Sequence, residues 1–298
     1  MPAPSLAWRC RDETLDCGSV PHIMGVLNVT PDSFSDGGAH ADSAAAIAHG
    51  IRMAEEGARI IDVGGESSRP GAEPVAEAEE LRRVVPVVKA LAARTGCLLS
   101  VDTTKAAVAD AALRAGAHIV NDITALGGDV RMADVVREHG AGLVLMHMRG
   151  TPRTMQQHPA YADVVREVAA FLAERMRRAM DAGIAPEQLA VDPGIGFGKT
   201  VEHNIRLLHG LDEFCALGRP VLIGVSRKSF LGALTGRPVN ERLAPSLGAL
   251  AFAVSRGAHL ARVHDVKESC EVARVAAILR TGQVSPNDVS GSHSIPRV

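Results

Sequence analysis

The sequence predicts an α/β fold in which eight β-α units close into a (β/α)8 or TIM barrel, and three observations support this. Short apolar runs alternate with amphipathic, alanine-rich segments of helical period, a pattern typical of β-α-β units and a parallel sheet. Eight such units follow one another at regular intervals from residue 21 onward. The chain has 298 residues, an ordinary length for one such barrel. An open doubly wound sheet is the alternative, but evenly spaced units without a second domain favour closure.

The predicted elements can be followed in order along the chain. The expected strands are 22–27, 59–63, 97–101, 117–120, 142–146, 189–191, 220–225 and 259–263. The expected helices are 42–57, 76–94, 104–115, 130–139, 161–182, 201–217, 242–256 and 267–280. A glycine able to adopt the left-handed conformation follows five of these helices, at Gly57, Gly116, Gly140, Gly183 and Gly257.

Both ends of the chain lie outside the predicted barrel, which spans residues 21–282. Residues 1–20 are expected to form an N-terminal extension. In this extension two short apolar stretches flank a polar turn, which would allow a small hairpin. Residues 283–298 contain too little apolar surface to pack, so we expect a disordered tail.

Composition excludes several classes of function. The formal net charge is −2 and no basic run is present, so we expect neither a nucleic acid nor an anionic membrane as a partner. The five cysteines form no C-x-x-C pair. The chain shows neither a cationic and apolar leader nor an apolar stretch long enough to span a membrane. These features predict a reduced, soluble, cytoplasmic protein.

Polar residues follow the predicted strands. The first strand ends at Asn28 and breaks into the polar loop 29–38. Barrel enzymes place their chemistry at the carboxyl ends of such strands. A solvated loop or a helix cap would explain any single residue, and Asp102 before Thr-Thr-Lys could be an N-cap. A rim that is polar all round is harder to explain as structure. The candidates are Asn28, Asp102, Asn121, Asp192, Lys228, Ser229, Arg262 and His264.

The candidate residues divide by chemistry. Carboxylates and an amide at Asp102, Asn121 and Asp192 suit a flat nitrogen heterocycle with several N–H donors. Positive charge on the opposite arc suits an anion such as phosphate, and its expected sources are Lys228, Arg262 and His264.

Two further features of the rim point to a ligand. The side chain of Asn28 offers a hard oxygen, which suits Mg²⁺ when phosphate and water complete its coordination. The glycine-rich turn 194–198 would let the backbone approach a ligand closely, but its spacing does not match a dinucleotide-binding fingerprint.

Eight motifs carry a resemblance to a known family over about residues 21–280. They are MGVLNVTPDSFSDGG at 24–38, IIDVGGESSRPGA at 60–72, SVDTTKAAV at 100–108, IVNDI at 119–123, LMHMRGTPRTMQ at 145–156, VDPGIGFGKT at 191–200, GVSRKSFLG at 224–232 and RVHDV at 262–266. With these motifs the sequence resembles the dihydropteroate synthase family, folate-pathway transferases built on a pterin-binding TIM barrel. Two departures from the family pattern, Ser68 where Thr is frequent and Pro245 where Gly is frequent, leave every residue of the pattern for binding or chemistry in place.

The resemblance implies an activity. The family condenses 6-hydroxymethyl-7,8-dihydropterin diphosphate with 4-aminobenzoate, giving 7,8-dihydropteroate and pyrophosphate, and sulfonamides compete with the arylamine. It further implies Mg²⁺ as the cofactor, a homodimer, and small molecules as the only substrates. A pterin-binding methyltransferase barrel is one alternative, and an inactive pterin-binding paralogue is another.

The resemblance also implies a role for each candidate residue. The pterin would be held by Asp102, Asn121, Asp192 and Lys228. The diphosphate would be held by Arg262 and His264, with Asn28 on Mg²⁺. The loops 28–38 and 64–71 would close over the diphosphate, bringing in Asp36 and Arg69 as catalytic groups. The aminobenzoate pocket would be shaped by Phe34, Ser68, Arg69, Pro70, Phe197, Lys228 and Ser229.

Overall fold

The structure is a computed structural model of the chain. It describes residues 6–18, 20–29, 38–67, 69, 71–157 and 159–284; for residues 38–42 only the backbone is described. The predicted C-terminal tail therefore lies almost entirely outside the described residues.

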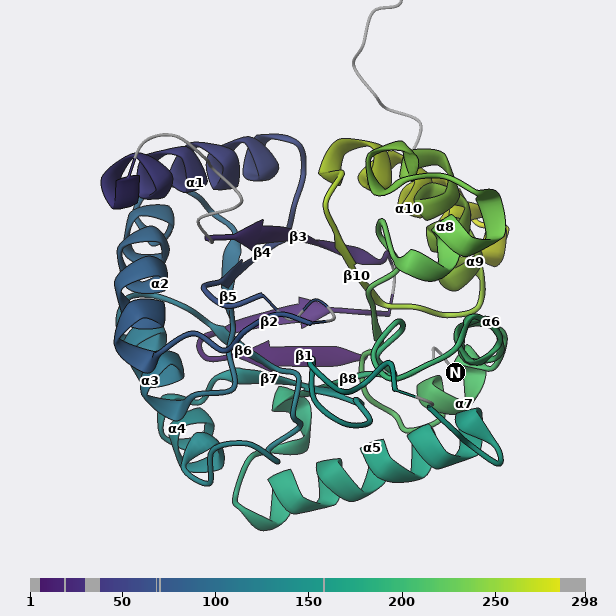
Figure 1. The fold of residues 1–298 in the computed structure, drawn as a ribbon, viewed down its shortest axis with the longest axis horizontal. Helices are drawn as coiled ribbons and strands as arrows, with labels where there is room; N and C mark the ends of the chain where they lie inside the picture. Colours follow the sequence, from purple (N-terminus) through teal and green to yellow (C-terminus); the bar gives the residue numbers. More distant parts are fainter. Residues whose placement is uncertain are drawn as a thin grey trace, which may run out of the picture.

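Eight parallel strands form the barrel (Figure 1). Their order is β8-β7-β6-β5-β4-β3-β10-β9. A bridge between Val191 and Val221 joins the two edge strands and closes the ring. The strands are β3 (His22–Asn28), β4 (Ile60–Gly64), β5 (Leu98–Asp102), β6 (Ile119–Asp122), β7 (Gly142–Met146), β8 (Leu189–Asp192), β9 (Leu222–Ile223) and β10 (Leu260–Val263). The predicted fold class is thus confirmed.

Helices surround the strands as a ring in Figure 1. They are α1 (Gly38–Glu55), α2 (Glu77–Ala92), α3 (Ala106–Arg114), α4 (Met132–His139), α5 (Val164–Asp181), α6 (Val201–His209), α7 (Leu211–Cys215), α8 (Ser229–Thr235), α9 (Leu243–Ser255) and α10 (Val266–Thr281). Two details differ from the prediction. Gly210 divides the expected helix 201–217 into α6 and α7, and α8 occupies a segment too short to show helical period. Pro245 lies in the first turn of α9, where its missing N–H costs nothing.

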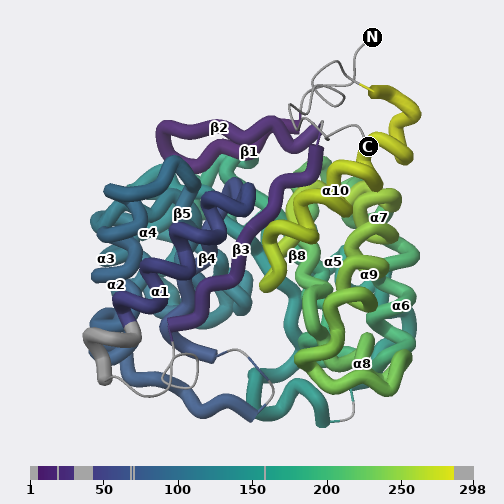
Figure 2. The backbone as a smooth tube through the Cα atoms, turned by 90° about the horizontal axis from the view of Figure 1, so that it is seen from above, coloured from purple at the N-terminus to yellow at the C-terminus, as the bar shows by residue number. Residues whose placement is uncertain are grey.

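An N-terminal hairpin covers one end of the barrel (Figure 2). Its strands β1 (Ala7–Cys10) and β2 (Glu13–Asp16) pair antiparallel. Trp8 is fully buried and donates from its indole N–H to the carbonyl oxygen of Gln188 at 2.8 Å. Its side chain joins Leu15 in a cluster with residues near the start of the barrel strands, including Met24 and Leu260. The hairpin therefore closes the end opposite the strands' carboxyl termini.

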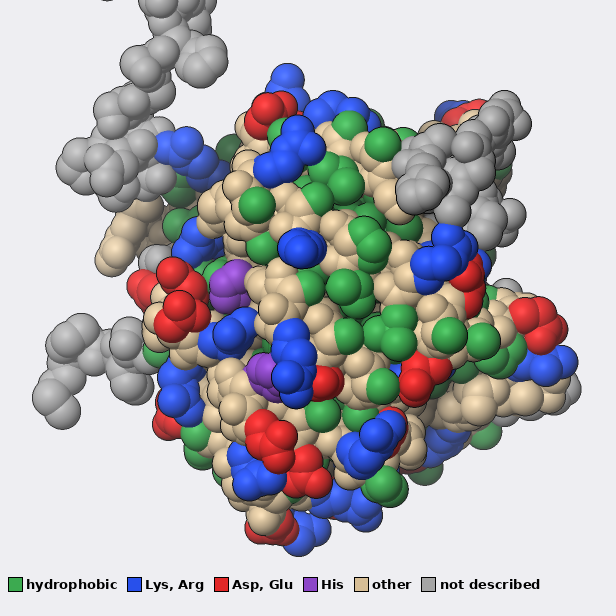
Figure 3. Space-filling view, turned by 90° about the vertical axis from the view of Figure 1, so that its left-hand side faces the viewer, with side chains coloured by type: hydrophobic (Ala, Val, Ile, Leu, Met, Phe, Trp, Pro, Cys, Tyr) green, Lys and Arg blue, Asp and Glu red, His purple; other side chains and the backbone are tan. Residues whose placement is uncertain are grey.

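On the side of the barrel that carries α2 and α3, basic and acidic side chains are interspersed (Figure 3). The five cysteines are free thiols, and burial raises the pKa of Cys17 to about 12. Within the described residues, no helix combines the length and the apolar character needed to cross a membrane.

Candidate active site

The carboxyl ends of four adjacent strands lie at one level of the barrel. Asn28 is in register with Gly64, Gly64 with Asp102, and Asp102 with Asn121. The side chains of Asn28 and Asp102 flank Gly64, because a Cβ atom built there would lie 3.8 Å from both Asn28 Oδ1 and Asp102 Oδ2. Pairing in a parallel sheet therefore brings together the three polar side chains that the sequence singled out on β3, β5 and β6.

Arg262 of β10 connects these strands across the barrel. Its Nη2 donates to Asp102 Oδ2 at 2.8 Å, and its Nε donates to Asp62 Oδ2 at 2.6 Å. Burial raises the pKa of Asp102 to about 7, while the positive charge of Arg262 opposes this rise. Asp102 makes no helix cap, since α3 begins after Lys105 without a side-chain cap. The predicted separation of acids and cations onto opposite arcs is wrong for Arg262, which contacts the acids directly.

Asp62 is a functional candidate that the sequence reading missed. It lies in the middle of β4 and is completely buried. Its Oδ2 also accepts a hydrogen bond from the Nδ2 of Asn121 at 3.0 Å. This bond fixes the side-chain amide of Asn121 with its oxygen free to face a ligand. A carboxylate inside an otherwise apolar strand was the available signal, because a buried charge requires a partner.

Asp192, Lys228 and Phe197 form the other half of the rim. The carboxylate of Asp192 accepts from the backbone N–H of Gly194 at 2.7 Å, and burial raises its pKa. The ammonium group of Lys228 lies 4.1 Å from the centre of the Phe197 ring. Burial lowers the pKa of Lys228 to about 8. The arrangement offers an acceptor, a cation and a flat apolar wall to one ligand.

His264 is held by Ser226. The backbone N–H of His264 donates to Ser226 Oγ at 3.1 Å, and the same oxygen lies 3.0 Å from His264 Nδ1. Burial and the nearby Arg262 lower the pKa of His264 to about 4. The expectation that His264 carries a positive charge is therefore wrong for the free protein at neutral pH. A hydroxyl that donates to Nδ1 leaves Nε2–H as the donor that the ring presents.

The loops after β7 and β8 lie against each other. A Cβ atom at Gly194 would be 1.9 Å from the carbonyl oxygen of His147, and one at Gly198 would be 2.6 Å from that of Arg149. Both glycines have positive φ angles, 69° and 63°. Contact with the neighbouring loop, rather than approach of a ligand, explains these two glycines.

A small polar cavity lies beside Asp102, lined among others by Glu66, Glu80 and Thr103. Lys105 bridges its two glutamates, with Nζ 2.5 Å from both Glu66 Oε2 and Glu80 Oε2. Glu80 is 1% exposed. The bridge ties the loop after β4 to the loop after β5 and to α2.

The remaining predicted residues lie in different places. Asn28 is half-buried at the end of β3, whereas Arg69 and Ser229 are exposed. Four predicted residues, Phe34, Asp36, Ser68 and Pro70, lie outside the described residues.

A metal ion would find few ligands among the described side chains. Within them, no group of three or more His, Cys, Asp or Glu residues could hold one. The Asn28 amide oxygen beside Gly64 fits a cation such as Mg²⁺ only if a ligand and water supply the other oxygens.

Comparison with known proteins identifies many close relatives. The model of the family described as pterin binding enzyme matches residues 24–264. Dihydropteroate synthase of Escherichia coli strain K12 is 50% identical over 257 residues, which cover 86% of the chain and 91% of that protein. The structure of Xanthomonas albilineans dihydropteroate synthase with 4-aminobenzoic acid is 46% identical, with a TM-score of 0.87 over 95% of the chain and 100% of that structure. The same enzyme in complex with 7,8-dihydropteroate is 44% identical, with a TM-score of 0.83, over 94% of the chain and 100% of that structure.

Proposed function

The chain belongs to the family of pterin-binding enzymes, and from this premise we propose how its rim performs the dihydropteroate synthase reaction. The chain condenses 6-hydroxymethyl-7,8-dihydropterin diphosphate with 4-aminobenzoate, giving 7,8-dihydropteroate and pyrophosphate. One observation carries the residue assignment: Asp102, Asn121 and Asp192 end three barrel strands at one rim, and Arg262 reaches Asp102 from across the barrel.

The pterin lies against the carboxyl ends of β5, β6 and β8. The carboxylates of Asp102 and Asp192 accept hydrogen bonds from ring and amino N–H groups of the pterin, and the Asn121 amide oxygen accepts another. Lys228 donates to a ring acceptor. Because the two carboxylates and the amide are buried, a ring without matching N–H groups would leave acceptor positions unpaired, which favours the correct ring.

The diphosphate lies next to His264 and Arg262. The free guanidinium hydrogens of Arg262 and the Nε2–H of His264 donate to its oxygens as the C–O bond to the pterin methylene breaks. Approach of an anion also raises the pKa of His264, so that the ring takes up a proton when the diphosphate binds. Asn28 would hold Mg²⁺, and the ion would supply positive charge to offset that of the leaving group.

The arylamine attacks the methylene carbon that the diphosphate leaves. Its nitrogen forms the new C–N bond and then loses a proton, for which Asp36 is the proposed acceptor. The ring of Phe197, with Lys228 and Ser229, forms one wall of its pocket. Phe34, Ser68, Arg69 and Pro70 supply the other wall once the loops 28–38 and 64–71 close. We therefore expect 4-aminobenzoate, and a sulfonamide mimic, to bind after the pterin diphosphate.

A turnover assay tests this function. The purified chain is incubated with both substrates and Mg²⁺, and dihydropteroate and pyrophosphate are measured together. Equal amounts of both products are expected. Pterin binding without turnover would favour an inactive paralogue, and methyl transfer from a methylated folate would favour the methyltransferase alternative.

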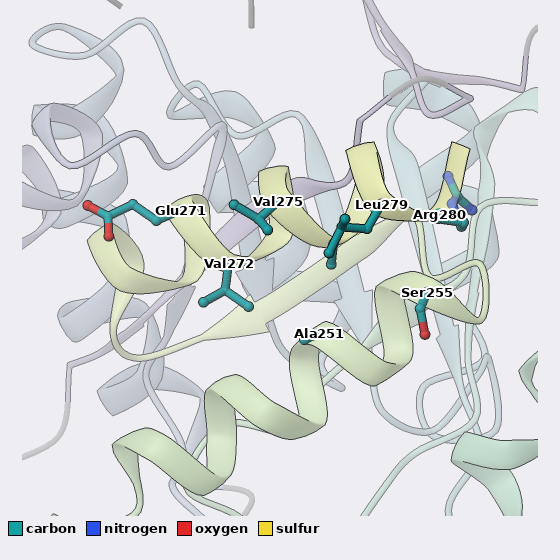
Figure 4. A pocket seen from close by; sticks show the side chains of 8 residues that line it. Ala251, Ser255, Glu271, Val272, Val275, Leu279 and Arg280 are labelled. Carbon is teal, nitrogen blue, oxygen red and sulfur yellow. The ribbon is translucent and has the colours of Figure 1, made fainter. Parts of the chain in front are cut away.

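We also propose that the enzyme is a homodimer that works in the cytoplasm. An open groove between α9 and α10 supports the dimer. Figure 4 shows Val275 and Leu279 of α10 between Glu271 on one side and Arg280, near the end of the helix, on the other. Val275 is 56% exposed and Leu279 is 77% exposed. A two-fold axis that pairs α10 antiparallel with its copy would bury both and set Glu271 against the partner's Arg280.

Sedimentation velocity tests the dimer. Leu279→Asp is expected to give monomers, because it places a charge in the apolar contact. Val130→Asp, at a position that is 92% exposed and lies outside the groove, is the matched control and should leave the dimer intact. Monomeric wild-type protein, or a dimer that survives Leu279→Asp, would contradict this interface. The cytoplasmic location is supported by the five free cysteines.

A further inference from the structure

A buried lysine that contacts no carboxylate of the described residues lies behind the rim. Lys199 follows the glycine-rich loop and is 3% exposed. Its Nζ lies 2.9 Å from His147 Nδ1, 2.9 Å from the carbonyl oxygen of Phe197 and 3.3 Å from that of His147. Burial of a lysine is costly unless its donors are satisfied. An ammonium group has three donors and no acceptor, so these three acceptors match its charged form.

His147, the side-chain partner of Lys199, is suited to accept a hydrogen bond. Burial and the charge of Lys199 lower the pKa of His147 to about 3, so the imidazole is neutral and can present an unprotonated Nδ1. The His147 ring packs edge-on against Phe171 at 4.8 Å. His147 is itself 5% exposed. Its ring is therefore a fixed acceptor and not a group exchanging protons with solvent.

The bonds of Lys199 join two loops that both reach the rim. His147 opens the loop after β7, and Phe197 belongs to the loop after β8. Two further hydrogen bonds join the same two loops. Tyr161 donates from its hydroxyl to the carbonyl oxygen of Gly198 at 2.9 Å, and the side-chain amide of Gln156 donates to the carbonyl oxygen of Gly196 at 2.8 Å. Lys199 is the only buried cation among these contacts. Its ammonium donates directly to the carbonyl oxygen of Phe197.

We propose that Lys199 is a positioning residue for the arylamine pocket: its ammonium fastens the loop after β8 to His147 and so fixes the Phe197 ring beneath Lys228. The proposal rests on the proposed function, because it gives Phe197 a part in binding 4-aminobenzoate. Lys199 touches no substrate in this account. Its effect reaches the substrate through the backbone of Phe197 and the 4.1 Å contact between that ring and the Lys228 ammonium.

The same geometry predicts a pH dependence. Burial lowers the pKa of Lys199 to about 7. The charged and titratable groups around it are Asp192, which raises this pKa, Lys228 and Arg149, which lower it, and the neutral His147. The hydrogen bonds of Lys199 join the loops after β7 and β8 while its ammonium group is protonated. Affinity for 4-aminobenzoate should therefore fall as pH rises through about 7.

Steady-state kinetics with both substrates test the proposal. Lys199→Met keeps the apolar stem and removes the ammonium. The KM for 4-aminobenzoate is expected to rise about tenfold near pH 6.5, with a smaller change in kcat and in the KM for the pterin diphosphate. The rise of this KM with pH should be smaller in the variant than in the wild type, because Lys228 still titrates in both proteins but Lys199 titrates only in the wild type.

Two further variants separate positioning from general damage. His147→Asn keeps an acceptor near the position of Nδ1 and should retain the wild-type KM within about threefold. His147→Leu removes the acceptor and should behave like Lys199→Met. Lys89→Met, at an exposed lysine of α2, is the control for loss of a positive charge and should match the wild type.

The outcomes are distinct. An unchanged 4-aminobenzoate KM in Lys199→Met overturns the proposal. An equal rise in the KM values for both substrates, together with a lowered melting temperature, also overturns the proposal, because that pattern marks a purely structural role. If the wild-type chain makes no dihydropteroate, the proposed function itself fails. This result differs from failure of the Lys199 proposal, because it is seen in the wild type without any variant.

Discussion

Arg262 neutralises two buried acids, so its removal should destabilise the protein in a pH-dependent way. Asp62 is 0% exposed and Asp102 is 8% exposed, and both lie within 2.8 Å of the guanidinium. Removing one partner of a buried pair typically costs about 3–5 kcal/mol, because the remaining charge cannot reach water. Arg262→Met is therefore expected to lower the free energy of unfolding by about 3–5 kcal/mol near pH 8.

The sign of the pH effect follows from linkage. Without Arg262, burial holds the folded-state pKa of Asp102 above its unfolded value. The stability that this group retains when protonated is lost as pH rises through the raised pKa. The deficit of Arg262→Met should therefore shrink as pH falls towards about 5.

Urea unfolding followed by circular dichroism at several pH values measures this effect. Arg227→Met is the matched control, because Arg227 pairs with Asp265 but its side chain is 38% exposed. A partly exposed pair is worth only about 0–1 kcal/mol. The account of the buried cluster would be refuted if the two variants lost equal stability, or if the deficit of Arg262→Met did not depend on pH.

Three further predictions concern the metal, the carboxylates and the hairpin. Asn28→Ala should raise the Mg²⁺ concentration needed for half-maximal turnover, and full wild-type activity in excess chelator would exclude the metal assignment. Pterin affinity in the wild type should fall as pH drops through about 7, because burial raises the pKa of Asp102 to about 7. The ionised carboxylate accepts N–H donors more strongly than the protonated acid, which turns one oxygen into a donor. Calorimetry that finds constant affinity would contradict this. Trp8→Ala should lower the free energy of unfolding by about 3–5 kcal/mol. Both KM values should stay unchanged, since Trp8 lies at the far end of the barrel. Raised KM values at unchanged stability would contradict the role of the hairpin in closing that end.

The parts of this protein that follow short-range rules could be predicted from its sequence. Buried parallel strands are continuous apolar runs, so the eight strands and the polar residues at their ends were visible. α8 was not, because seven residues are too few to show helical period.

The pairing of side chains could not be predicted in the same way. Arg262 and Asp62 are 200 residues apart in the chain, and only the closed ring of strands brings them together. Lys199 follows a glycine-rich turn that suggested a ligand site. The structure instead shows its ammonium buried between two loops, a contact that depends on how the loops after β7 and β8 fold against each other.

In the proposed complex the pterin binds over the strand-end carboxylates of Asp102 and Asp192. Calorimetric titration of the pterin diphosphate into wild type, Asp102→Ala and Asp192→Ala measures the contribution of each carboxylate. Each variant should bind at least about tenfold more weakly, because N–H donors of the ligand lose a charged acceptor in a buried site, at a cost of about 1.5–3 kcal/mol. Wild-type affinity in either variant would place the heterocycle elsewhere and contradict the account.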